Sequence, residues 1–226
     1  MAGIAEADDR PVGEAAALLS AYAPERVVRR LGERASAAGL GELLDPAPQV
    51  LQILAHSVHD GRRERPTVFV LSADGGADDG LLTSDVIDTL PAPPLVLLTG
   101  CRTGFGPERR GDAASADLAG AFLRAGSRAV VVSQADLAWG PALTATRRFH
   151  EAVRGDGVAP AEALRRERVA LWTRFGPGAP WAGGLLAVVG TGQQPVFAAR
   201  RPAPWPAAGW WALGVLALGL GVWWRG

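Results

Sequence analysis

Two short stretches, Leu51–Ser57 (LQILAHS) and Val96–Gly106 (VLLTGCRTGFG), decide the fold that we expect of this chain. Each begins with an aliphatic run and ends in small or polar residues, the pattern of a buried strand that emerges at the edge of a parallel sheet. Elsewhere along the chain, further aliphatic runs alternate with segments of helical periodicity. Such alternation predicts an α/β domain with a mostly parallel sheet.

The sequence also predicts the bounds of the individual elements. Ser36 and Thr83 are candidate helix N-caps, because their hydroxyl groups can accept from the first free N–H groups of a helix. Proline stands at the start of two later helices, where its missing N–H costs nothing. The predicted strands are 26–31, 50–55, 95–99, 129–133 and 184–189, with a hairpin of 67–71 and 81–82, and the predicted helices are 12–22, 36–44, 83–90, 113–125, 141–153 and 160–172.

Composition narrows the class of protein. The chain has 226 residues, with 23 basic and 23 acidic side chains and a formal net charge of zero. Nucleic acid is therefore not expected as a partner, because phosphate binding needs a basic surface. The single cysteine, Cys101, excludes an intramolecular disulfide and the cysteine-rich zinc and iron–sulfur sites. We expect no metal and no cofactor.

The C-terminal stretch 202–224 carries no charged residue and is bracketed by tryptophan pairs at 210–211 and 223–224. About 20 apolar residues in a helix cross a bilayer, with indoles at both interfaces. We therefore predict a transmembrane helix over 207–226, preceded by a Pro/Ala/Arg tether over 196–206. Arg200 and Arg201 before the helix favour a cytoplasmic position for the domain. The alternative, a helix buried or lying on the surface, predicts a polar face, and none occurs between 212 and 222.

Two reactive side chains follow the two central strands. His56 comes directly after the strand 50–55, and Cys101 comes after the strand 95–99. If these strands are parallel neighbours, both side chains emerge at the same edge, where α/β sheets bind ligands. A thiol and an imidazole form the minimal set for nucleophilic acyl transfer. The alternatives are a buried structural cysteine, a structural histidine, and His59 in place of His56 as the base.

The same residues resemble a known family. LQILAHS and VLLTGCRTGFG resemble the two catalytic motifs of the CHAT domain, a bacterial relative of caspases and separases. In that family one strand ends in His-Gly, and the next core strand ends in a small residue, Cys, any residue and Thr-Gly. Gly80–Leu90, Gly111–Gln134 and Thr146–Trp172 resemble, in order, the segments around and after these motifs. The resemblance covers roughly Val27 to Val189 and implies a caspase-like three-layer αβα sandwich.

The resemblance implies roles for individual residues. Cys101 would be the nucleophile and His56 the general acid/base of a cysteine endopeptidase that acts on a protein or peptide. The backbone N–H groups of Ser57 and Cys101 would hold the oxyanion. Asp136 is the acidic candidate for recognising a basic substrate residue, and a solvated loop aspartate is the alternative reading.

Three features depart from the family pattern. Ser57 replaces a glycine, and its Cβ would clash if that position needed a positive φ. An acidic pair is replaced by SQADLAWGP (133–141), where only Asp136 is acidic. Residues 1–8 resemble a frayed remnant of the first strand, without preceding sensor repeats. Either the start is misplaced, or the strand is short and the sensor or activator is a separate protein.

We therefore predict a CHAT domain over 1–195, with a shortened first strand, held at a membrane by its C-terminal helix. Its expected function is cleavage of a protein partner through a Cys/His dyad. The alternative is a catalytically inactive CHAT-like domain that acts as a membrane-bound interaction module. A transacylase that uses the same dyad is a third reading, and no sequence feature favours it.

Overall fold

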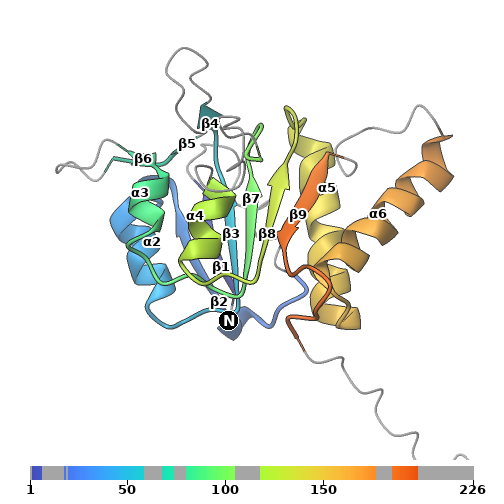
Figure 1. Ribbon diagram of the computed structural model, residues 1–226, viewed down its shortest axis with the longest axis horizontal. Coiled ribbons are helices and arrows are strands. Elements are labelled where there is room, and N and C mark those ends of the chain that lie inside the picture. The colour runs from blue at the N-terminus through green and yellow to red at the C-terminus, as the bar shows by residue number, and fades with distance from the viewer. Residues whose placement is uncertain are drawn as a thin grey trace, which may run out of the picture.

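The computed structural model of the chain describes residues 2–6, 18, 20–58, 68–73, 80–104, 118–176 and 185–197 (Figure 1). Its centre is a six-stranded sheet with the strand order β2-β1-β3-β7-β8-β9. All neighbours are parallel except β8 and β9, which are antiparallel. The prediction of a mostly parallel α/β sheet is confirmed. The strands are β1 (Ala2–Glu6), β2 (Val27–Leu31), β3 (Val50–Leu54), β7 (Leu95–Thr99), β8 (Ala129–Ser133) and β9 (Leu186–Gly190).

A second, three-stranded antiparallel sheet follows the carboxyl end of β3. It has the order β4-β5-β6. The predicted hairpin corresponds to β5 and β6, whereas β4 was not predicted from the sequence. The strands are β4 (Ser57–Val58), β5 (Val68–Val70) and β6 (Leu81–Leu82).

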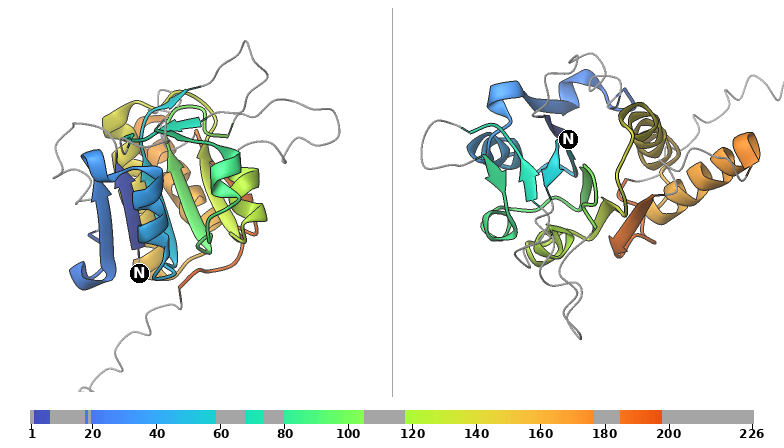
Figure 2. Two further views of the ribbon diagram at one scale, coloured as in Figure 1. Left: turned by 90° about the vertical axis from the view of Figure 1, so that its left-hand side faces the viewer. Right: turned by 90° about the horizontal axis from the view of Figure 1, so that it is seen from above.

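Helices cover both faces of the large sheet, as the view from above shows (Figure 2). One face carries α2 (Ala37–Leu44), α3 (Ser84–Ile87) and α4 (Leu118–Arg124). The other face carries α5 (Trp139–His150), the π-helical turn η3 (Glu151–Asp156) and α6 (Pro160–Phe175). This arrangement is a three-layer αβα sandwich. Two short 3-10 turns, η1 (Pro24–Arg26) and η2 (Gly32–Arg34), flank β2.

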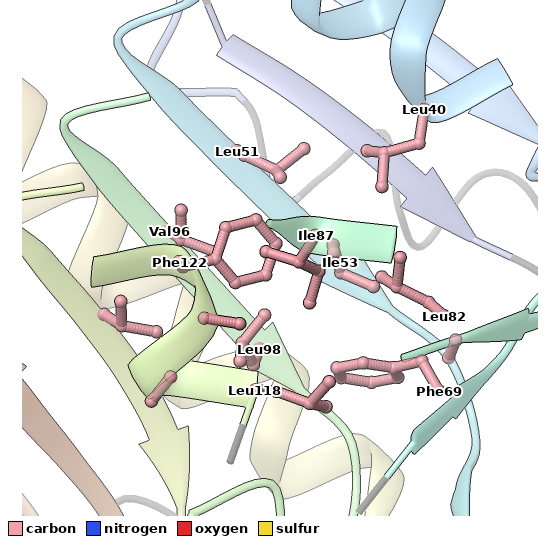
Figure 3. Close-up of a cluster of buried hydrophobic side chains, with 14 of the residues drawn as sticks. Leu40, Leu51, Ile53, Phe69, Leu82, Ile87, Val96, Leu98, Leu118 and Phe122 are labelled. Atoms are coloured by element: carbon pink, nitrogen blue, oxygen red, sulfur yellow. The ribbon is translucent and has the colours of Figure 1, made fainter. Parts of the chain in front are cut away.

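The core is divided between the two faces by the alternation of side chains along each strand. All five residues of β3, of β7 and of β8 are buried, as expected for strands covered on both sides. Figure 3 shows the face beneath α2, α3 and α4, where aliphatic side chains from β3 and β7 surround Phe122. The residues that β3, β7 and β8 contribute to this cluster are Leu51, Ile53, Val96, Leu98, Val130 and Val132, and those that they contribute to the opposite face are Val50, Leu54, Leu95, Leu97, Ala129 and Val131.

One polar side chain interrupts this core. Gln52, in the middle of β3, is fully buried. Its amide nitrogen donates to Thr99 Oγ1 at 2.6 Å, and its Oε1 lies 3.1 Å from His150 Nε2. The other ring nitrogen of His150 lies 3.0 Å from the hydroxyl group of Tyr22. Tyr22 therefore donates to Nδ1, the Nε2–H donates to Gln52, and the imidazole is neutral.

Most predicted bounds agree with the structure. Ser36 caps α2 by accepting from the Gly39 N–H at 3.1 Å, and Thr83 caps α3. The helix after Thr83 ends at Ile87 rather than at residue 90. The helix predicted over 113–125 is described only from Leu118, and most of the helix predicted over 12–22 lies outside the described residues.

The first strand differs from our expectation. Residues 1–8 were expected to form a frayed remnant, yet Ala2–Glu6 form a five-residue strand that pairs with β2 on one side and β3 on the other. An interior parallel strand has both of its edges bonded, which explains how so short a segment is held.

The predicted membrane helix over 207–226 and the tether beyond Phe197 lie outside the described residues. Among the residues that the structure does describe, no helix has the length and apolar character that a membrane span requires. The start of the tether is described: Phe197 packs edge-on against Tyr22, with 5.9 Å between the ring centroids.

The buried histidine predicts a pH dependence of stability. Burial lowers the pKa of His150 to about 3, whereas an unfolded chain takes up this proton near pH 6.5. The unfolded state therefore binds more protons between these values, so the stabilisation is complete above pH 6.5 and is lost as the pH falls. Lowering the pH from 6.5 to 5 should cost about 2 kcal/mol through this group.

Urea unfolding of the wild-type chain and of His150→Gln at pH 7 and pH 5 measures this loss. The variant should be less stable at pH 7 but should lose less stability on acidification. An unchanged pH dependence in His150→Gln would show that His150 is not the titrating group.

Candidate active site

The carboxyl ends of β3 and β7 lie side by side, because Leu54 and Thr99 are partners in the parallel register. His56 follows β3, and Cys101 follows β7, with one residue between in each case. Both line one cavity of about 140 Å³ at this edge of the sheet. The sequence-predicted pair is thus brought to one site. The cavity is completed by Ala55, Thr99, Gly100, Leu137, Trp139 and Ala142.

The turn that carries Cys101 is fastened to the end of β8 by two hydroxyl groups. Thr103 Oγ1 donates to the Leu98 carbonyl at 3.0 Å and accepts from the Ser133 N–H at 2.8 Å. Ser133 Oγ accepts from the Thr103 N–H at 3.0 Å and donates to the Gly100 carbonyl. Thr103 and Ser133 are both fully buried. We call this pair the Thr103–Ser133 clasp.

Two glycines on either side of Cys101 allow this turn to approach its neighbours. A Cβ on Gly100 would lie 2.6 Å from Phe69 and 2.8 Å from the Ala55 carbonyl oxygen. A Cβ on Gly104 would lie 2.8 Å from Val132. Real Cβ atoms do not approach so closely, so any larger residue would displace the turn from the strands. The Gly-Cys-x-Thr-Gly pattern is therefore explained by packing as well as by chemistry.

The second sheet holds the histidine. The Val70 N–H of β5 donates to the His56 carbonyl at 2.8 Å, which fixes the backbone of His56, and its side chain is exposed at the cavity. Ser57, in β4, donates its hydroxyl hydrogen to the Cys101 carbonyl. Ser57 does not have a positive φ, so the clash considered for a serine at this position does not arise.

The nucleophile candidate has a donor beside it. Cys101 is partly buried, and the Leu137 N–H lies 3.5 Å from its Sγ.

Asp136 forms an ion pair with Arg102. One carboxylate oxygen lies 3.0 Å from Arg102 Nε and the other lies 3.0 Å from a terminal guanidinium nitrogen, so the ion pair is bidentate. Arg102 has a φ of 53°, one of only two positive values for non-glycine residues in the described chain, and its N–H donates to the Ala135 carbonyl at 3.1 Å. Asp136 is close to the site in sequence but does not line the cavity.

Several functional features were missed from the sequence. Leu137, Trp139 and Ala142 supply a wall of the cavity, and nothing in their residue types distinguishes them from ordinary core or loop positions. Their place after the strand 129–133 was the only available signal. His59, the rival base, lies outside the described residues. Within the described ranges, no group of three or more metal-ligating side chains occurs.

Comparisons with known proteins agree with this geometry. The family model of the CHAT domain matches residues 6–207. The chain belongs to the CHAT domain family. No curated protein matches the chain in sequence.

Two solved structures have a similar fold. The crystal structure of the Arg specific cysteine proteinase gingipain R matches with a TM-score of 0.60 and 12% identity, over 88% of this chain and 47% of that one. The complex of the Porphyromonas gingivalis RgpB pro- and mature domains matches with a TM-score of 0.58 and 13% identity, over 88% and 48%. This CHAT domain chain thus spans about half the length of each match. At this identity the likeness shows the fold, which is that of caspase-like cysteine proteinases.

The Thr103–Ser133 clasp predicts a stability change. Thr103→Val should lower the free energy of unfolding by about 1–3 kcal/mol, because it leaves the buried Ser133 N–H and the Leu98 carbonyl without their partner. Chemical denaturation measures the loss. Thr173→Val is the matched control, since Thr173 Oγ1 donates to the Val169 carbonyl at 2.8 Å on an exposed helix surface. Equal losses in the two variants would contradict a special role for the clasp.

Proposed function

We propose that this CHAT domain is a cysteine endopeptidase in which Cys101 is the nucleophile and His56 the general acid/base. The observation that carries the proposal is the presence of both side chains in one cavity at the carboxyl ends of β3 and β7. Family membership and the caspase-like fold point to the same chemistry.

The reaction follows from these two groups. The Cys101 thiolate attacks the carbonyl carbon of a peptide bond and forms a C–S bond, and the oxygen becomes an oxyanion. The His56 imidazolium gives its proton to the departing amine nitrogen as the C–N bond breaks. A water molecule then attacks the thioester while His56 accepts one of its protons. The C–S bond breaks, the carboxylic acid product leaves, and the thiolate is restored.

The orientation of the Ser57 N–H supports a role for this group in holding the oxyanion. The Val70–His56 bond marks residues 56 and 70 as a hydrogen-bonded pair of the antiparallel ladder. Such pairs alternate with non-hydrogen-bonded ones, so Ser57 opposite Phe69 directs its N–H away from β5. This orientation supports Ser57 as one oxyanion donor.

The second proposed donor is the Cys101 N–H. In the described chain, the N–H groups of the next three residues, Arg102, Thr103 and Gly104, donate to Ala135 and Ser133 at the end of β8. The Cys101 N–H makes none of these bonds. The turn is thus held in place, while the Cys101 N–H takes no part in these bonds. A backbone donor fixed in this way can bond to the oxyanion without any rearrangement of the turn.

We further propose that the domain works at a membrane. The uncharged stretch 202–224 with its flanking tryptophans supports a single C-terminal transmembrane helix, and Arg200 and Arg201 support a cytoplasmic position of the domain. The proposed substrate is a protein partner, and a separate sensor or activator protein is a further proposed partner.

Covalent labelling tests the dyad. Peptidyl acyloxymethyl ketones should add to the full chain in detergent, with a thioether formed at Cys101 and a carboxylate displaced. Cys101→Ala should abolish the mass increase, and His56→Ala should reduce its rate by about 100-fold, the usual contribution of an acid/base group. Intact-mass spectrometry over time gives both rates.

Iodoacetamide is the control reagent, because it reports an accessible thiol without requiring a peptide site. Alkylation of Cys101 by iodoacetamide, with no peptide probe reacting and no effect of His56→Ala, would contradict the peptidase. That result would favour the inactive, membrane-bound interaction module.

The anchor has its own test. Membranes from cells that express the full chain should retain it in alkaline carbonate and release it in detergent. Leu216→Arg combined with Leu218→Arg should move the chain into the carbonate-soluble fraction, since each arginine costs about 2.5–3.5 kcal/mol at a helix centre. Release of the unaltered chain by carbonate would exclude a spanning helix.

A further inference from the structure

The cavity that holds Cys101 and His56 has a wall supplied by another part of the chain. Leu137 and Trp139 come from the segment between β8 and α5 and from the start of α5, and Ala142 lies one turn further on. The Leu137 N–H is 3.5 Å from Cys101 Sγ, so the wall begins beside the sulfur. A carbonyl carbon poised for attack lies about 3–3.5 Å from its nucleophile. The neighbouring substrate side chain therefore lies against this wall.

The wall is apolar. Leu137 and Trp139 are partly exposed, Ala142 is buried, and Ala55 closes the side of the cavity nearest β3. The one hydroxyl group among the residues that line the cavity, that of Thr99, already accepts from the buried Gln52 amide at 2.6 Å. An apolar substrate side chain would cover exposed aliphatic and aromatic surface, whereas a charged one would lose part of its hydration beside these apolar groups.

In the described part of the chain, the carboxylate next to Leu137 in sequence is already paired. Asp136 adjoins Leu137, but both of its carboxylate oxygens are held by Arg102 at 3.0 Å. The pair is exposed to solvent, so it contributes little energy, but its two parallel bonds orient both groups. A basic substrate side chain would have to displace Arg102 to reach Asp136, and an acidic one would meet a neutralised pair. This pair therefore favours neither sign of charge.

The volume of the cavity limits the size of the side chain. Its 140 Å³ is close to the roughly 150 Å³ of an engineered apolar cavity that admits benzene. Benzene is the ring of a phenylalanine side chain, and leucine and methionine side chains are of similar size.

We propose that this cavity receives the side chain that precedes the cleaved bond and selects a leucine-, methionine- or phenylalanine-sized apolar residue. Leu137 and Trp139 are its specificity-determining residues. The inference rests on the proposed function, since it names the substrate class of the same Cys101/His56 site.

A matched set of acyloxymethyl ketone peptides tests the preference. The peptides are identical except for leucine, methionine, phenylalanine, arginine or aspartate at the position next to the ketone. With the full chain in detergent, we expect the fastest apolar probe to label Cys101 at least about tenfold faster than the arginine and aspartate probes, the lower end of what a pocket contact discriminates. Leu137→Asp should reverse the order by slowing the leucine probe and accelerating the arginine probe.

Arg102→Gln tests whether the pairing of Asp136 with Arg102 keeps basic side chains out of the cavity. Releasing Asp136 should raise the arginine-probe rate several-fold and leave the leucine-probe rate within twofold of the wild-type value. Arg124→Gln is the matched control. Arg124, at the end of α4, makes a bidentate ion pair with Asp88, which follows α3, at 3.2 Å and 2.9 Å. That variant should change neither rate.

Each outcome separates the two claims. Fastest labelling by the arginine or aspartate probe, or equal rates for all five, would overturn the apolar preference and leave the peptidase intact. Labelling by iodoacetamide alone, with no peptide probe reacting, would overturn the proposed function and the preference with it.

Discussion

The geometry of the site depends on how the turn after β7 is fastened to the end of β8. A chain that leaves the edge of a sheet has backbone groups that no ladder satisfies, and buried groups of this kind need partners. The Thr103–Ser133 clasp supplies them with two hydroxyl groups, and Gly100 and Gly104 let the turn come close enough for the bonds to form. Cys101 is consequently held at the cavity by residues that do not take part in its chemistry.

A second polar connection runs beneath the site. Gln52 lies under Thr99, and through His150 it is joined to Tyr22 on the face of the sheet covered by α5. Every member of this row is bonded to the next, which is the condition under which a buried polar network stabilises one arrangement rather than weakening the core. The position of Thr99 in the cavity lining is therefore linked, through Gln52 and His150, to the packing of α5.

The sequence predicted the parallel sheet, the strands that end at the site and the pair His56 and Cys101, because aliphatic runs and their ends carry a local signal. It did not predict β4, which has only two residues and exists through its pairing with β5. The prediction of a frayed first strand was wrong for Ala2–Glu6, because this strand is held by β2 and β3 on its two sides. The pairing of Asp136 with Arg102 and the apolar wall of the cavity could not be predicted either, since they depend on the path of the chain between β8 and α5.

The central claim is that the edge of the sheet at Cys101 and His56 cleaves peptide bonds. Incubating the full chain with a proteome-derived peptide library, and sequencing the new ends by mass spectrometry, tests this most directly. The account predicts new ends that are absent with Cys101→Ala and that follow leucine, methionine or phenylalanine. The reaction is repeated with membranes and soluble extract of the source cells, which would supply any activator. Identical sets of ends with the wild-type chain and with Cys101→Ala under both conditions would contradict the account.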